Sequence, residues 1–371
     1  MSPTSPPESE ADTIAPTSDR DAPINAADRR RLDEEIERYR DCTNVHELPA
    51  IFHLWSHRYV LPKLQACGFE SIAEFQLHYL DDACRAGAAA GDPEPLIASI
   101  GSGNCDVEVE LAEALRARGL DQFRFHCLDL NPHMLERGRA LAADRNLEQH
   151  FLFEEVDLDR WTPSRRYAGA LAHHSLHHLV GLEHLFASLR EALGDHGVFV
   201  INDMIGRNGH MRWPEALHHV GSIWSERLEP RHRYNNASRC MSGDFVNFDC
   251  SQEGNEGIRA QDILPLLLEE FHFDLFIGFA NIIEPFVDRI YGHNFDAENP
   301  QDVDLILEIA ELDERLLSTG EITPTQMFAA VRTRPVASPR HYAHWTADFC
   351  VRWPDSPYRR SGSPHHAAPT A

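Results

Sequence analysis

The sequence predicts an α/β protein built on a doubly wound, mostly parallel sheet of seven strands. Two observations predict this class. Between residues 93 and 205, short apolar runs alternate with segments whose apolar residues recur at helical period. The apolar runs are continuous and do not alternate with polar residues, which is typical of strands that helices cover on both faces.

Five strands and three helices are expected in this part of the chain. The strands are PLIASIG, FRFHCLDL, HFLFEEVDL, YAGALAHH and GVFVINDMIG, and the helices between them are VEVELAEALRARG, PHMLERGRALAADR and LEHLFASLREAL. Right-handed crossovers between parallel strands place such helices on both faces of the sheet. Residues 274–281 and 327–333 are expected to supply the remaining two strands.

The predicted sheet is one part of a longer chain. Residues 27–92 have helical periodicity, and Ser71 followed by Glu74 three residues later has the pattern of a capping box. Two long connections interrupt the later strands, and such connections are usually lids or binding segments. The expected division is a disordered lead-in at 1–26, an N-terminal helical cap at 27–92, a sheet domain at 93–335 with helical and loop-rich lid inserts at 206–256 and 283–324, and a partly disordered C-terminal extension at 336–371.

Composition limits the classes of ligand. The 371 residues include 34 Lys and Arg against 59 Asp and Glu, a formal net charge of −25. Such a surface repels phosphate backbones and anionic lipids, so we expect no nucleic-acid partner and no membrane partner. No apolar run reaches the roughly 18 residues of a membrane helix, and the cysteines form no CxxC pair. We expect a cytoplasmic protein with a small-molecule substrate, and the sequence leaves a homo-oligomer open.

Three consecutive predicted strands end in residues that suit a nucleoside ligand. The first ends in SIGSGNCDVE, where Gly101 and Gly103 allow a tight turn and a close approach of the backbone. The second ends at Asp129, whose carboxylate can accept hydrogen bonds from both hydroxyls of a ribose. The third ends at Asp157, which can accept from an adenine amino group. Because the carboxyl ends of parallel strands meet at one edge of a doubly wound sheet, these residues are expected to form one site.

These segments resemble class I S-adenosylmethionine-dependent methyltransferases. The resemblance rests on IASIGSGNCDVEVELA, LDLNPHMLERGR, VDLD and SLHHL, and it covers residues 95–205. It implies a Rossmann-like methyltransferase fold, S-adenosyl-L-methionine as cofactor, and methyl transfer to a hydroxyl, carboxyl or amine of a small molecule. It also implies a cofactor site in which Gly101 and Gly103 flank the methionine part, Asp129 holds the ribose, and Asp157 and Leu158 border the adenine, with Ser99, Asp106 and Leu130 completing the site.

Two other functions stay open. An NAD-dependent oxidoreductase can use a similar sheet, but its pyrophosphate needs a third glycine at the helix start, where this chain has Asn104, Cys105 and Asp106. The first motif of the resembled family usually begins with an acid and contains that third glycine, whereas this chain has Ser99 and Cys105 in those places. These departures keep a methyltransferase-like binding protein without catalysis as the second alternative.

A run of histidines, LAHHSLHHLVGLEHL, follows the fourth predicted strand. Neutral histidine is a common metal ligand, but four ligands cannot easily converge from one short stretch, so we expect no bound metal. His173, which leaves the strand, and His177 are expected to face the pocket, where a base of near-neutral pKa assists transfer to a hydroxyl or a protonated amine. Asp203, at the end of the fifth strand, is the third catalytic candidate, whereas His178 and His184 are expected to pack or to cap a helix.

Two segments are expected to cover the site. The front helices carry Phe52, Trp55 and Tyr59 at helical spacing, and the first insert carries arginines, Trp213 and His210, which suit a planar or anionic substrate. The pocket is therefore expected between the strand ends and these two segments, because methyl transfer gains from the exclusion of water.

Overall fold

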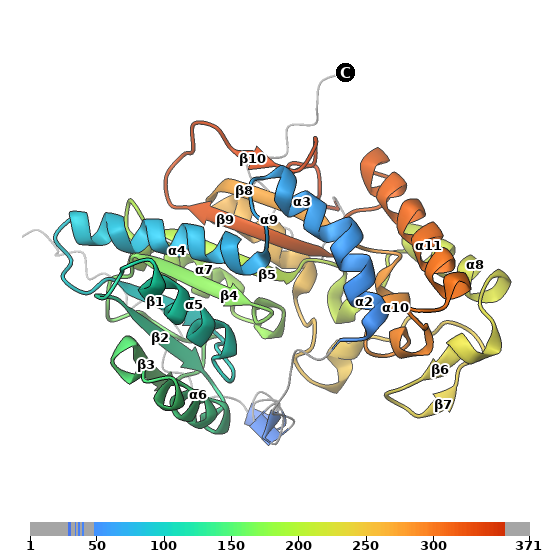
Figure 1. The fold of residues 1–371 in the computed structure, drawn as a ribbon, viewed down its shortest axis with the longest axis horizontal. Coiled ribbons are helices and arrows are strands. Elements are labelled where there is room, and N and C mark those ends of the chain that lie inside the picture. The colour runs from blue at the N-terminus through green and yellow to red at the C-terminus, as the bar shows by residue number, and fades with distance from the viewer. Residues whose placement is uncertain (1–28, 31–33, 35, 38, 41–47, 353–371) are drawn as a thin grey trace, which may run out of the picture.

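An eight-stranded sheet forms the centre of the protein (Figure 1). The structure is a computed structural model that describes residues 29–30, 34, 36–37, 39–40 and 48–352, so the predicted disordered lead-in at 1–26 lies outside the described residues. The order of the strands in the sheet is β10-β8-β9-β5-β4-β1-β2-β3. Their bounds are β1 (Leu96–Ile100), β2 (Arg124–Asp129), β3 (Phe151–Glu155), β4 (Gly169–His173), β5 (Val198–Met204), β8 (His272–Phe279), β9 (Gln326–Arg332) and β10 (Arg340–His341).

The strand directions locate the edge at which ligands bind in such sheets. β3, β2, β1, β4 and β5 run parallel, β9 runs antiparallel between β5 and β8, and β10 pairs in parallel with β8. This arrangement confirms the predicted doubly wound, mostly parallel class. From β1 the chain crosses to β2 on one side and later to β4 on the other, so the switch point lies at the carboxyl ends of β1 and β4.

The sheet has one strand more than the seven that were predicted. The additional strand, β10, belongs to the predicted C-terminal extension and pairs Arg340 with Leu275 and His341 with Phe276 at the edge of β8. Such a short strand has no hydrophobic periodicity, and backbone pairing with an existing edge forms it, so no local pattern indicates it. Trp345, shortly after β10, is buried, so this part of the extension belongs to the folded protein.

Helices cover both faces of the sheet, as right-handed crossovers require. α4, α5 and α6 lie side by side on one face, and α7 packs beside α9 on the other (Figure 1). Ser71 caps α4 as predicted, because its Oγ accepts a hydrogen bond from the Glu74 backbone N–H at 3.0 Å. The helices are α2 (Ala50–Trp55), α3 (Leu61–Ala66), α4 (Ile72–Ala89), α5 (Asp106–Ala117), α6 (Pro132–Asp144), α7 (Leu182–Leu193), α8 (Pro214–Glu226), α9 (Ala260–Glu270), α10 (Glu284–Val287) and α11 (Pro300–Thr319).

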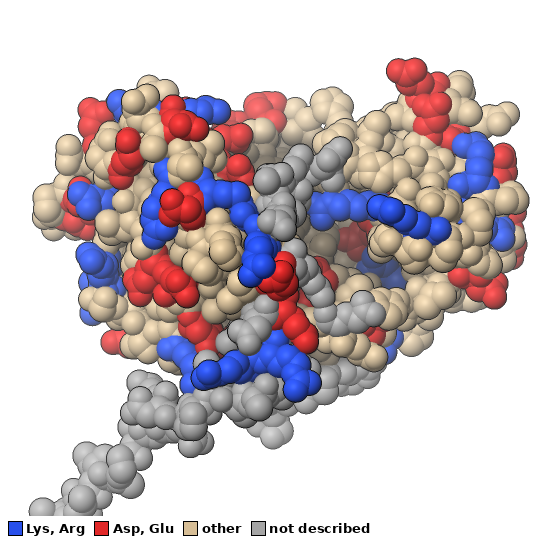
Figure 2. All heavy atoms as spheres, turned by 90° about the horizontal axis from the view of Figure 1, so that it is seen from below, with Lys and Arg blue, Asp and Glu red and all other residues tan. Residues whose placement is uncertain are grey.

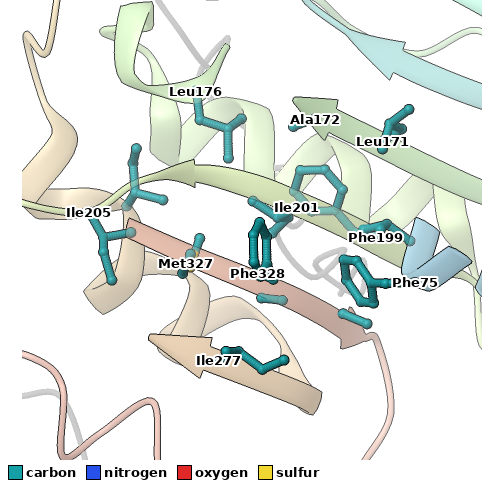
Figure 3. Close-up of a cluster of buried hydrophobic side chains, with 14 of the residues drawn as sticks. Phe75, Leu171, Ala172, Leu176, Phe199, Ile201, Ile205, Ile277, Met327 and Phe328 are labelled. Atoms are coloured by element: carbon teal, nitrogen blue, oxygen red, sulfur yellow. The ribbon is translucent and has the colours of Figure 1, made fainter. Parts of the chain in front are cut away.

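α4 is a layer of the sheet domain and not part of a cap over the strand ends. It packs on β1, β4 and β5, and its Phe75 is fully buried, with its ring centroid 6.3 Å from that of Phe328 in β9. Figure 3 shows Phe75 in the same cluster as Phe199 and Phe328. The predicted domain boundary at residue 92 therefore separates α4 from the strands that it covers. α2, in contrast, packs on α10 and α11 of the second insert.

The two inserts pack on each other beside the sheet. The first contains α8 and a hairpin of β6 (Tyr234–Asn235) and β7 (Cys240–Met241), and the second contains α10 and α11. Trp224 of α8 is buried, its ring centroid lies 4.9 Å from that of Tyr291, and its Nε1 donates to the Gly243 carbonyl at 2.9 Å. The inserts are therefore folded segments with an apolar interface of their own.

The excess of acidic residues does not produce a uniformly acidic face. Figure 2 shows acidic and basic side chains interspersed over one side of the molecule, which is hollowed between its two halves. Among the described residues, no helix combines the length and the apolar character needed to cross a membrane.

Replacing Phe75 by alanine should lower the free energy of unfolding by about 3–5 kcal/mol, because the change removes a fully buried ring between α4 and the sheet. Chemical denaturation measures this loss. The matched control is Phe248→Ala in the first insert, where the residue is 49% exposed and the loss should stay below about 1 kcal/mol. Equal losses in the two variants would contradict the place of α4 in the core.

Candidate active site

A glycine turn follows β1 at the switch point. Gly101 and Gly103 have φ values of +65° and +54°, in the left-handed region that favours glycine. A Cβ atom at Gly101 would lie 2.6 Å from the Cβ of Ser175, and one at Gly103 would lie 3.2 Å from the Cε of Met134. The backbone at Gly101 therefore passes directly against the histidine segment that follows β4, and no side chain fits between them.

Asp129 ends β2 beside this turn. Its Oδ2 accepts a hydrogen bond from the Gly103 backbone N–H at 2.8 Å, and its Oδ1 accepts from the Asn131 N–H at 2.8 Å. The side chain is half-buried, as is that of the neighbouring Leu130. These two bonds hold the Asp129 carboxylate in one orientation at the carboxyl edge of the sheet.

Asp157 and Leu158 follow β3, next to Asp129. The backbone joins the two strand ends, because the Val156 N–H donates to the Asp129 carbonyl at 2.9 Å. Asp157 is half-buried, and its Oδ1 accepts from the Asp159 N–H at 3.1 Å, whereas Leu158 is buried. The predicted ligand residues at the ends of the second and third strands therefore lie side by side, as the sequence indicated.

Ser99 lies beneath the turn and does not line its open side. It is 1% exposed, and its Oγ donates to Oε1 of Glu108 at 2.5 Å. Burial raises the pKa of the Glu108 carboxyl to about 7, although the Ser99 hydroxyl favours the charged form. The acid beneath the turn thus comes from the first turn of α5. This geometry corrects the expectation for Ser99, which supports the turn through Glu108.

The N-terminus of α5 differs from one that binds phosphate. Cys105, in the place of the third glycine, has φ +60°. Its Sγ lies against Gly138 of α6, where an added Cβ would be only 2.7 Å from the sulfur. Asp106, the first residue of α5, is half-buried, and Glu108 follows in the same turn. Carboxylates at a helix N-terminus offset the partial positive charge that would otherwise attract an anion.

Asp203 organises the histidine segment from the end of β5, where it is fully buried. Its Oδ2 accepts from the backbone N–H groups of Ser175 and Leu176 at 2.9 and 2.7 Å. Its Oδ1 accepts from the Met204 N–H at 2.8 Å and lies 2.6 Å from Nδ1 of His177. Burial raises the pKa of this carboxyl, but the charge and hydrogen bond of His177 together hold it well below its ordinary value. Asp203 is therefore an anion that positions the loop and does not face a pocket.

His177 also belongs to a second group of polar side chains. It is 3% exposed, and its Nε2 lies 3.5 Å from Oε1 of Glu256, which Nε2 of His210 approaches at 2.7 Å. Burial lowers the pKa of His177, but Asp203 and Glu256 outweigh this effect and raise it to about 10. Burial acts to raise the pKa of Glu256, yet the two histidines hold it well below its ordinary value. The group thus joins the loop after β4 to both ends of the first insert.

Two other histidines of the run have different surroundings. His173, at the end of β4, is half-buried, with Nδ1 3.0 Å from Nε2 of Gln76 and Nε2 3.5 Å from Nδ2 of Asn202. His184 contacts the carbonyl of Trp161 through Nε2 at 2.8 Å. His173 therefore lies at the strand end between two amide side chains, whereas His184 makes a structural contact, as predicted.

Ile36, Tyr39 and Arg40 lie at the carboxyl edge of the sheet. Nδ2 of Asn131 donates to the Ile36 carbonyl at 3.1 Å, and Nη2 of Arg137 donates to the Tyr39 carbonyl at 3.1 Å. The ring centroid of Tyr39 lies 6.1 Å from that of His178. This part of the predicted cap therefore borders both the end of β2 and the histidine run.

The aromatic side chains that were expected to cover the site make packing contacts instead. Trp55 is 3% exposed, and Tyr59 donates to a carbonyl of α11 at 3.4 Å. The guanidinium groups of Arg207 and Arg352 lie 5.2 and 4.3 Å from the ring centre of Trp213. These residues stabilise the inserts and their contact with the C-terminal extension.

Sequence reasoning missed two acids of this region, Glu108 and Glu256. Acids are common in the first turn of a helix, so the sequence does not show that Glu108 is buried. Glu256 lies far from His177 along the chain. A sequence signal for the approach of Glu256 to the histidines was the glycine near each end of the first insert. In the structure these two glycines join the ends of the insert, because the Gly209 N–H donates to the Gly257 carbonyl at 2.8 Å.

No protein-family model and no curated protein matches the chain. The fold aligns with an O-methyltransferase from a trans-AT PKS multienzyme of Brevibacillus brevis in complex with S-adenosyl-L-homocysteine (14% identity, TM-score 0.42, 78% of this chain and 84% of that chain). It also aligns with geranyl diphosphate C-methyltransferase from Streptomyces coelicolor A3(2) in complex with Mg²⁺, geranyl diphosphate and S-adenosyl-L-homocysteine (12% identity, TM-score 0.43, 82% and 98%). A third alignment is with the [4+2]-cyclase SpnF (13% identity, TM-score 0.36, 69% and 82%).

The strand order and helix layers of this chain are those of a doubly wound, mostly parallel α/β fold, as the sequence predicted. The identities and TM-scores are low, so the assignment of a function depends on the residues of the site itself.

Replacing Glu108 by glutamine should change how stability depends on pH. The pKa of Glu108 is raised from 4.5 to about 7 in the folded protein, so the unfolded chain loses this proton first and wild-type stability falls as the pH rises from 4.5 to 7. The variant lacks this loss, and its free energy of unfolding should exceed that of the wild type by up to about 3 kcal/mol at pH 8, with little difference at pH 4. Denaturation across this pH range measures the difference.

The matched control for this change is Glu110→Gln, at an exposed position of the same helix, which should leave the pH dependence unchanged. Parallel curves for the Glu108 variant and the wild type would contradict the buried, partly protonated state of Glu108.

Proposed function

We propose that this protein transfers the methyl group of S-adenosyl-L-methionine to a small-molecule acceptor. The observation that carries the proposal is the orientation of the Asp129 carboxylate at the end of β2, fixed by the Gly103 and Asn131 backbone N–H groups. A carboxylate offers about four acceptor sites, so the vicinal hydroxyls of a ribose can bind to it in addition to these backbone groups. The turn at Gly101 and Gly103 provides the close approach that the rest of such a ligand needs.

The charge at the start of α5 discriminates between classes of cofactor. A dinucleotide places its pyrophosphate on a helix N-terminus, and Asp106 at the first position of α5 would repel it. A sulfonium cofactor with an amino-acid tail has no phosphate and carries positive charge, so an acid at this place is compatible with it. The residues present therefore support S-adenosyl-L-methionine over NAD.

The neighbouring strand end suits the base of the same cofactor. Leu158 is buried and Asp157 is half-buried, immediately beside Asp129. An apolar side chain can contact the face of an adenine, while a carboxylate can accept from its amino group. The glycine turn, the ribose acceptor Asp129 and the adenine acceptor Asp157 then follow β1, β2 and β3, which are neighbours in this order across the sheet.

The bound cofactor supplies a methyl group that its sulfonium has already activated. The residues of this chain then have to hold the acceptor in line with that methyl group and exclude water. We assign the contact with the acceptor to His173, which Gln76 and Asn202 hold at the end of β4. Asp203 is a positioning residue, because it orients the loop that carries His177. Ile36 and Tyr39, together with the first insert, flank this edge.

Asp129→Asn should weaken binding of S-adenosyl-L-homocysteine by about 1.5–3 kcal/mol, roughly 10- to 150-fold, because the substitution removes the charge from the acceptor of the ribose hydroxyls. Isothermal titration calorimetry measures the affinity, and Asp121→Asn, an exposed acid before β2, is the matched control and should bind as the wild type does. NAD should not bind to either protein.

The result that would contradict this assignment is an affinity unchanged by Asp129→Asn in a folded variant, or binding of NAD in preference to the sulfonium compound. Transfer itself is tested with methyl-labelled S-adenosyl-L-methionine and a metabolite extract. Label in an extract component identifies the acceptor, and cofactor binding without transfer to any component would indicate a binding protein without catalysis.

A further inference from the structure

Two histidines and one glutamate direct their side chains at a common point beside the predicted pocket. His177, His210 and Glu256 each offer one ligand atom, and these atoms all lie within 4.8 Å of one another. Oε1 of Glu256 lies 2.7 Å from Nε2 of His210 and 3.5 Å from Nε2 of His177. Two ligand atoms that are each about 2.1 Å from one ion lie roughly 3–3.5 Å apart. The two glutamate–histidine distances lie close to this range, and the two histidine nitrogens, which are within 4.8 Å of each other, would have to move into it to share an ion.

The orientation of His177 is fixed from outside the cluster. Asp203 lies 2.6 Å from Nδ1 of its ring, so Nε2 is the nitrogen that faces Glu256. The backbone N–H groups of Ser175 and Leu176 hold the Asp203 carboxylate in place. A carboxylate that accepts from the far nitrogen of a ligating histidine is the usual support of protein metal sites, because it fixes the ring and raises the basicity of the ligand atom.

The orientation of His210 is fixed by the two ends of the insert. His210 has φ +56°, an uncommon conformation for a residue with a side chain. The Gly209 N–H donates to the Gly257 carbonyl, and a Cβ at Gly257 would lie 2.9 Å from Cε1 of the His210 ring. The Ile258 N–H in turn donates to the His177 carbonyl at 3.1 Å. These contacts bring Glu256 and His210 onto the His177 loop.

Nε2 of His177 and Nε2 of His210 both face the Glu256 carboxylate, with Nδ1 of His177 directed at Asp203. A divalent cation that displaces the protons on these two nitrogens would satisfy the same carboxylate. We propose that His177, His210 and Glu256 bind a divalent first-row transition-metal ion. Two imidazole nitrogens and one carboxylate are a donor set for Fe²⁺, Zn²⁺, Mn²⁺ or Co²⁺, and three protein ligands leave positions open for water or for an oxygen of a substrate. This proposal differs from the expectation from the sequence that the histidine run binds no metal.

The place of the site indicates its use. Ser175, two residues before His177, is the residue against which Gly101 of the glycine turn packs. The proposed metal site therefore lies at the same edge of the sheet as the turn, so that an oxygen-bearing acceptor bound there would lie near the predicted cofactor site. This use rests on the proposed methyl transfer, whereas the metal site itself does not.

The test is titration of the EDTA-treated, dialysed full-length protein with Co²⁺ and with Zn²⁺. His365 and His366 of the C-terminal tail are first replaced by alanine in all variants, so that the tail contributes no ligands. We expect about one ion per chain, with a Co²⁺ absorption spectrum that shows nitrogen and oxygen ligation and no thiolate charge transfer. His210→Ala and Glu256→Gln should each abolish stoichiometric binding. Asp203→Asn should weaken it by about 10- to 100-fold through the orientation of His177.

Matched controls are His218→Ala and Glu226→Gln, both exposed residues of the same insert, and both should bind metal as the parent protein does. Circular dichroism of each variant establishes folding, and the S-adenosyl-L-homocysteine affinity of the Glu256 variant separates this proposal from the proposed function. Retained cofactor affinity with lost metal binding supports the metal site. Failure of both metals to bind, or binding that survives both ligand substitutions, overturns it and leaves His177, Glu256 and His210 as a network that shares protons.

Discussion

The buried anion of Asp203 is the constraint on which the rest of the site depends. An isolated carboxylate without contact to water is strongly disfavoured, so its charge requires several donors at close range. Here backbone N–H groups from the loop after β4 and from β5, together with the ring of His177, supply them. The path of that loop is therefore the one that directs enough hydrogen-bond donors at the Asp203 carboxylate. Any other path would leave the buried charge of Asp203 without donors.

The same constraint reaches the glycine turn after β1. Ser175 donates its backbone N–H to Asp203 and its hydroxyl to the Ile100 carbonyl at 2.5 Å. Because this serine is fixed, Gly101 has no room for a side chain. Three consecutive features of the carboxyl edge, the end of β5, the loop after β4 and the turn after β1, are thus linked through one buried group, and a ligand at the turn is adjacent to the histidine cluster for the same reason.

Two side chains from α5 and the turn before it have their partners elsewhere in the fold. Glu108 accepts a hydrogen bond from the Ser99 hydroxyl beneath the turn. The sulfur of Cys105 lies against Gly138 of α6, where a side chain would leave it no room. Both contacts give the glycine turn a buried support.

The sequence by itself determined the strands, their parallel class, the glycine turn and the acids at the ends of β2 and β3, because apolar periodicity and strand-end residues are local signals. It did not show α4 as a layer of the sheet, the two-residue β10, the burial of Glu108, or the meeting of His210 and Glu256 with His177. Only the tertiary structure decided these, because each depends on contacts between segments that are far apart in the chain. A histidine has the same local pattern whether its partner is water or a carboxylate from a distant insert, so its surroundings, and hence its chemistry, are set by the packing of the fold.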